Sequence, residues 1–169
     1  MQNLWAPWRM EFIKAEKTEG CIFCRFPAET GEEADRKNLI LGRSTHAFVI
    51  LNRFPYNNGH LMVIPRRHTA DFAGLPTEEG DDLHRLLQVS VGLLERAYRP
   101  QGFNVGMNLG VPAGAGIADH LHYHVVPRWG GDTNFMPVIS DTKVMIQHLD
   151  ESYQQLRRLY DERLRGAAR

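Results

Sequence analysis

Short apolar runs separated by turn-rich segments dominate the first three quarters of the chain. Those at 38–42, 47–51 and 60–65 end in, or are followed by, residues that favour turns or break strands. Two further runs, at 103–109 and 120–126, flank a glycine-rich link. Runs of this length, rich in branched apolar residues, predict five short strands.

Two longer segments show helical spacing instead of short runs. The first is predicted to begin at Thr77, whose hydroxyl can cap the first turn, and to end before Pro100. The second is predicted at about 143–164, and the polar residues 25–37 are expected to form a loop. The helical faces are defined by Leu83, Leu86, Leu87, Ser90, Leu94 and Ala97 in the first helix, and by Met145, Leu149, Leu156 and Tyr160 in the second.

The order of these elements predicts the fold class. Strands, a helix, strands and a helix predict an α+β fold, in which an antiparallel meander of about five strands packs against two main helices. The long crossover through the first helix leaves some mixed strand pairing open. Residues 1–169 are expected to form one domain, with an N-terminal segment at about 1–37 and a C-terminal helix at about 143–164.

The composition excludes some classes of protein. Lys and Arg together number 20, as do Asp and Glu, and a formal net charge of zero argues against a broad nucleic-acid-binding surface. No apolar run approaches the ~18 residues of a membrane span and no signal peptide is visible, so a cytoplasmic protein is expected. Trp5 and Trp8 are interpreted as a packing anchor at a subunit interface, with base stacking as the alternative.

Three histidines at alternate positions carry the most informative chemical signal: His120, His122 and His124. A strand has a period of two residues, so their imidazoles are expected on one face, where they suit a nucleophile, a proton donor or a metal site. A neutral imidazole can attack phosphorus when its other nitrogen is tied to an acceptor. The middle histidine is best placed to attack, and His124 to donate a proton. The spacing alone leaves the nucleophile and zinc interpretations equally open.

The residues around the triplet add weight to phosphate chemistry. Gly110, Gly114 and Gly116 precede it, and glycines let backbone N–H groups approach phosphate oxygens closely. Arginines near the strand ends can add positive charge or be solvated surface residues; they are Arg53, Arg66, Arg67 and Arg128. The remaining histidines outside any such context are expected on the surface or in loops, and they are His46, His84 and His148.

Cys21 and Cys24 have the spacing of half a zinc site. Zinc takes four tetrahedral ligands, and His68 and His120 are the candidates to complete the set. Two reduced thiols without a metal are the alternative. A redox pair is disfavoured because no thioredoxin-like βαβ pattern follows.

Together these motifs resemble the histidine triad (HIT) family of nucleotide hydrolases and transferases. The string HLHYHVV at 120–126 is similar to the family signature, and 51–65 is similar to its first strand pair. The ending VVPR at 125–128 is similar to the branch of the family that cleaves dinucleoside polyphosphates. Residues 102–110 and 127–132 further resemble the diadenosine tetraphosphate phosphorylases of the family. The Val-Pro-Arg ending after the triplet speaks against the branch that hydrolyses aminoacyl-adenylates or phosphoramidates. The resemblance covers about 20–140 and implies a HIT-like fold in a homodimer.

The resemblance also implies a role for each matched residue. His122 is implied as the nucleophile that forms a nucleotidyl-histidine at the α-phosphate, and His124 as the residue that contacts the scissile phosphate and assists the leaving group. Asn52 is implied to hold the ribose, and His60 to lie close to the triad. The other implied substrate contacts are Asn108, Gly114, Ala115 and Gly116, and the implied ligands of one structural zinc are Cys21, Cys24, His68 and His120.

One departure from the family pattern bears on the reaction. Where the family's phosphorylases carry a Gly-Ser pair, this chain has Ala115-Gly116, and the missing hydroxyl favours hydrolysis of diadenosine tri- or tetraphosphate. Phosphorolysis, and a nucleotide-binding module with little turnover that takes AMP, are the alternatives. Zinc is the expected cofactor, and whether magnesium binds together with the substrate is left open. Neither nucleic acid nor a membrane is an expected partner.

Overall fold

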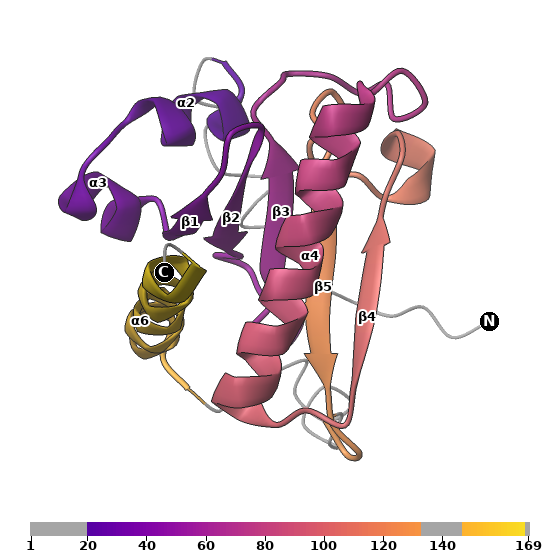
Figure 1. The fold of residues 1–169 in the computed structure, drawn as a ribbon. Coiled ribbons are helices and arrows are strands. Elements are labelled where there is room, and N and C mark those ends of the chain that lie inside the picture. Colours follow the sequence, from indigo (N-terminus) through magenta and orange to yellow (C-terminus); the bar gives the residue numbers. More distant parts are fainter. Residues whose placement is uncertain (1–19, 133–146, 168–169) are drawn as a thin grey trace.

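The computed structural model describes residues 20–132 and 147–167, which build one sheet with helices on its faces (Figure 1). Trp5, Trp8 and the first residues of the second predicted helix, 143–146, lie outside the described residues. None of the described helices combines the length and apolar character needed to cross a bilayer.

The five strands pair in the order β1-β2-β3-β5-β4, and each neighbouring pair is antiparallel. The predicted α+β class and antiparallel sheet are therefore confirmed, without parallel pairing among these strands. The helix α4 (Thr77–Tyr98) carries the chain from β3 to the edge strand β4, and β5 lies between these two strands. The strand bounds are β1 Ile40–Arg43, β2 Ala47–Leu51, β3 Leu61–Pro65, β4 Gly102–Met107 and β5 Tyr123–Arg128.

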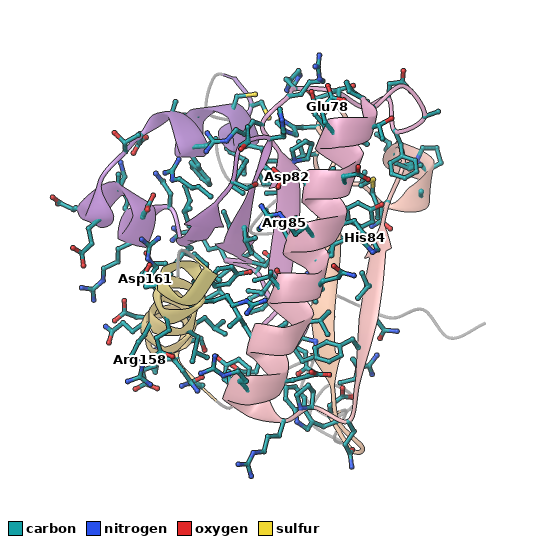
Figure 2. The ribbon with its side chains drawn as sticks, viewed as in Figure 1. Glu78, Asp82, His84, Arg85, Arg158 and Asp161 are labelled. Carbon is teal, nitrogen blue, oxygen red and sulfur yellow. The ribbon has the colours of Figure 1, made fainter. Side chains whose placement is uncertain are left out.

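Two long helices cover one face of the sheet: α4 (Thr77–Tyr98) and α6 (Leu149–Ala167) (Figure 1). Tyr160 of α6 is fully buried against α4, where its hydroxyl lies 2.7 Å from Ser90 Oγ. Figure 2 looks onto this face and labels polar side chains of both helices, Glu78, Asp82, His84, Arg85, Arg158 and Asp161. Their apolar stripes, facing the sheet, build the larger core.

The face of the sheet that was predicted to carry the histidines is the one opposite to α4 and α6. Side chains alternate across a strand, and Val125 of β5 lies in the core under α4, so its neighbour His124 points to the other side. Met62 of β3 is paired with His124 and belongs to a second, smaller core on that side. The site therefore lies behind the sheet in the view of Figure 1.

Three local predictions were wrong. The predicted loop at 25–37 overlaps two short helices, α2 (Ile22–Ala28) and α3 (Glu32–Lys37), which are too short to show a helical period. Acidic residues in the first turn of α3 and basic residues in its last turn complement the helix dipole. Thr77 does not cap α4, because the N-cap residue is Pro76 and no side-chain cap bond forms.

The third wrong prediction is the start of the histidine strand, which begins at Tyr123 rather than at residue 120. The N–H of Leu121 donates to the carbonyl of Thr69, outside the strand ladder. His120 and His122 therefore occupy the segment that leads into β5.

Candidate active site and metal centre

The four residues implied as zinc ligands lie together. Cys21 is the N-cap residue of α2, Cys24 is in its first turn, His68 follows β3, and His120 precedes β5. Their ligand atoms all lie within 4.8 Å of one another. His120 Nδ1 lies 3.3 Å from Cys21 Sγ and 3.2 Å from His68 Nδ1, and Cys24 Sγ lies 3.4 Å from His68 Nδ1.

These separations fit a tetrahedral metal ion. Zinc bonds of ~2.3 Å to sulfur and ~2.0 Å to nitrogen place neighbouring ligand atoms roughly 3.3 to 3.8 Å apart. Two thiols and two imidazoles are a ligand set that zinc favours. The cluster in this part of the chain is therefore a candidate zinc centre that would be closed by four protein ligands.

Groups outside the cluster orient its imidazoles. His120 Nε2 lies 2.9 Å from the carbonyl oxygen of Pro65. A carbonyl only accepts, so Nε2 carries the proton and Nδ1 directs its lone pair at the sulfurs. Burial lowers the pKa of His120, which favours the neutral form that a metal ligand needs. The other ring nitrogen of His68, Nε2, lies 3.8 Å from Asp119 Oδ2.

His122 has the geometry of a nucleophile. Its Nδ1 lies 2.8 Å from the carbonyl oxygen of His120, so Nδ1 carries the proton and Nε2 keeps a free lone pair. The side chain is 4% exposed, and burial lowers its pKa from the usual value of 6.5. The imidazole is therefore neutral at pH 7, which is the reactive form.

A second chain of hydrogen bonds sets the tautomer of His124. The backbone N–H of Tyr56 donates to His60 Nδ1 at 3.0 Å, and the Asn52 amide nitrogen lies 3.3 Å from the same atom. His60 Nδ1 is therefore an acceptor, and in neutral His60 the proton is on Nε2. His60 Nε2 lies 2.9 Å from His124 Nδ1. Donation along this bond leaves His124 with its own proton on Nε2.

The other implied substrate residues fall into two places. Asn52 lies beside His60, and its Oδ1 accepts the N–H of Phe54 at 2.9 Å. Asn108 lies in the segment between β4 and β5, where its amide nitrogen is 3.4 Å from the carbonyl of Gly114. The N–H groups of Gly114 and Ala115 donate to the carbonyls of Val111 and Gly110, at the start of the short 3-10 helix Val111–Ala113. Gly116 follows this turn.

Two aromatic residues that sequence reasoning missed contact the histidines. The Tyr56 ring lies 4.6 Å from the ring of His60 and 5.7 Å from that of His124, between centroids. The Phe23 ring lies 5.5 Å from that of His120 and 5.2 Å from that of His122. The position of Phe23 between the two cysteines was the available signal, whereas Tyr56 lies in a turn-rich segment that gives none.

Fold and site together define the class: an α+β protein in which buried histidines lie beside a Cys/His cluster. The sequence model described as HIT domain matches residues 33–131, so the chain belongs to the histidine triad family, as the triplet motif predicted. The match includes all three histidines of the triplet and His68. It begins after Cys21 and Cys24, so half of the cluster comes from outside the matched region.

Individual relatives agree with this membership. The chain is 37% identical over 161 residues to the AP-4-A phosphorylase of Mycobacterium tuberculosis, covering 92% of this chain and 83% of that protein. A Zn-bound histidine triad family protein from Mycobacterium smegmatis has a TM-score of 0.65 at 25% identity, covering 88% of this chain and 97% of that one. The diadenosine triphosphate hydrolase of Plasmodium falciparum shares the fold, with a TM-score of 0.57 at 18% identity over 73% of this chain and 75% of that one.

Proposed function

We propose that this enzyme cleaves dinucleoside polyphosphates, such as diadenosine tri- or tetraphosphate, through a nucleotidyl-histidine on His122, with water as the final acceptor. The observation that carries the proposal is the 2.8 Å hydrogen bond from His122 Nδ1 to the His120 carbonyl. It places the ring proton on Nδ1 and leaves Nε2 as an unprotonated nucleophile. The 37% identity to a protein named AP-4-A phosphorylase supports the substrate class.

The two steps follow from the tautomers. The His122 Nε2 lone pair attacks the α-phosphorus, a P–N bond forms, and the P–O bond to the remaining nucleotide breaks. The Nε2 proton of His124 stabilises the charge that develops on the departing oxygen. Water then attacks the phosphorus and loses a proton to the solvent, the P–N bond breaks, and the neutral imidazole of His122 and a nucleoside monophosphate are released. His60 is buried, so its role is to hold the tautomer of His124.

The substrate contacts are assigned by the same proposal. Asn52 holds the ribose, and Asn108 with the loop Gly114, Ala115 and Gly116 lies along the phosphates. Orthophosphate as the second-step acceptor is the second candidate, and the identity to the AP-4-A phosphorylase favours it. The absence of a hydroxyl at Ala115-Gly116 favours water instead.

The metal centre is proposed to hold one structural zinc through Cys21, Cys24, His68 and His120. When bound, zinc would supply a fixed tetrahedral anchor for these side chains rather than a step of the reaction. The chain's own residues do the positioning: the carbonyl of His120 orients His122, and Pro65 orients His120. Magnesium would reach the site with the polyphosphate, whose charge it screens.

We also propose a homodimer in the cytoplasm. The edge strand β4 exposes about half of Val105, and Leu109 and Val111 after it are also exposed. An edge strand with apolar side chains suits pairing with the same strand of a second copy. Two free cysteines in one cluster suit a reducing compartment.

Product analysis tests the reaction. Mass spectrometry of diadenosine tetraphosphate after incubation in H₂¹⁸O is expected to show AMP carrying ¹⁸O, with or without orthophosphate. ADP that forms only when orthophosphate is present would replace water by phosphate as acceptor. His122→Ala is expected to abolish both turnover and the nucleotidyl-enzyme, whereas the matched variant His84→Ala, in an exposed residue of α4, should keep both. Full turnover by His122→Ala would overturn the mechanism.

A further inference from the structure

The first turn of α2, which carries the two cysteines, also places a buried aromatic ring beside His122. Phe23 lies between Cys21 and Cys24, in the first turn of α2, and is 1% exposed. Its ring centroid lies 5.2 Å from that of His122, with the ring planes at 53°. The same ring meets His120 edge-on at 5.5 Å. One side chain from this helical turn therefore contacts both an imidazole of the Cys/His cluster and the implied nucleophile.

His122 needs such a contact to be fixed. The hydrogen bond from Nδ1 to the His120 carbonyl holds one atom of the ring but does not by itself fix the ring plane about that bond. Two ring neighbours limit this rotation: Phe23, and His124 at a centroid distance of 5.1 Å. Reaction at phosphorus requires the Nε2 lone pair to point at the reacting atom, so the ring plane decides how often attack is productive.

The direction of Phe23 is set from both sides. Cys21 and Cys24 hold their sulfurs toward His68 and His120, within the 4.8 Å cluster. The N–H groups of Cys24 and Arg25 donate to the Cys21 carbonyl, which closes the turn around Phe23. On its other side the ring enters the smaller core, made of Ile40, Phe48, Ile50, Met62 and Ile64. The turn and the cluster thus specify where the ring points.

We propose that Phe23 is a positioning residue, which transmits the geometry of the Cys/His cluster to the His122 imidazole. The inference rests on the proposed role of His122 as nucleophile. It gives the first turn of α2, which lies outside the matched HIT region, a part in the rate of the reaction. This turn acts on the angle of attack through the contact between the Phe23 and His122 rings.

The test compares two identical substitutions in the same core. Phe23→Leu removes the ring beside His122, whereas Phe48→Leu removes a ring from β2 that is equally buried in the smaller core. Phe23→Leu is expected to lower kcat by roughly 10- to 100-fold with little change in KM, because misdirection affects attack rather than binding. Phe48→Leu is expected to keep kcat within about twofold. Equal kcat losses in the two variants would overturn the proposal, as would an unchanged kcat in Phe23→Leu.

A spectroscopic measurement separates this inference from the reaction itself. The ring protons of His122, assigned by their loss in His122→Asn, are compared at about pH 8, where imidazoles with a reference pKa of ~6.5 are neutral. In Phe23→Leu they should move toward the positions of the exposed His84, and in Phe48→Leu they should not move. If the wild-type protein forms no nucleotidyl-enzyme, the proposed function fails, and these resonances still decide whether Phe23 positions the ring. Phe23→Met, which keeps most of the volume, replaces Phe23→Leu if that variant does not fold, and the same shifts are expected.

Discussion

Replacing His60 with Leu removes the N–H that His60 Nε2 directs at His124 Nδ1 over 2.9 Å, and it leaves a side chain of similar size. Without that donor, the proton of His124 is free to occupy Nδ1, and Nε2 then presents a lone pair to the substrate instead of a hydrogen. Loss of one acid–base contribution lowers kcat by roughly 10²-fold, the lower end of the usual range. The backbone N–H of Tyr56 also loses its acceptor, which costs about 1–3 kcal/mol of stability.

A series of AMP aryl esters provides the assay, because their leaving groups differ in basicity while the nucleotide stays the same. If His124 stabilises the departing oxygen, the deficit of His60→Leu should grow as the leaving group becomes more basic. The matched variant His84→Leu alters an exposed histidine on α4 and should follow the wild-type dependence (Figure 2). Equal slopes for His60→Leu and the wild-type protein would refute the assignment of the His124 proton to Nε2.

Three further predictions concern pH, metal and packing. Burial lowers the pKa of His122, so its imidazole stays neutral as the pH falls. The acid limb of the kcat/KM profile should therefore lie below pH 6.5, and a limb at or above that value would contradict this prediction. Cys24→Ser removes one cluster ligand and should weaken zinc binding by at least ~100-fold in competition with a chromogenic chelator, whereas wild-type affinity would argue against the four-ligand site. A Cβ on Gly42 would lie 2.8 Å from the ring of Tyr160, so Gly42→Ala should cost about 1–3 kcal/mol in thermal denaturation, and an unchanged Tm would show that the ring yields freely.

The strands were predictable because their signal is local. β2 and β3 are buried along their whole length, so each appears in the sequence as an unbroken apolar run. The helix α4 was predictable because 22 residues give several repeats of its apolar stripe. By contrast, α2 and α3 are too short to repeat, and their existence depends on the cysteine turn and on the charges at the ends of α3.

The hydrogen-bond chain through His60 was not predictable from local pattern. Its last bond, to His124, requires β3 and β5 to pair in one register, with Met62 opposite His124. The predicted start of β5 was wrong for a similar reason, because the N–H of Leu121 donates to the carbonyl of Thr69, a residue distant in sequence. A Cys-x-x-Cys spacing specifies only half of the ligands of the cluster, so His68 and His120 could be named as candidates, but only the family resemblance implied that the four residues come together.

The sequence positions of the cluster have a consequence for folding. Cys21 and His120 are 99 residues apart and meet only after β3 and β5 have taken their places. In a metal site with ligands close in sequence, the ion can nucleate the fold, but here loop closure over such a span comes first. An ion that binds only the completed arrangement stabilises it by mass action. Uptake of the ion therefore reports the end of folding, and we expect it to follow the slowest refolding phase.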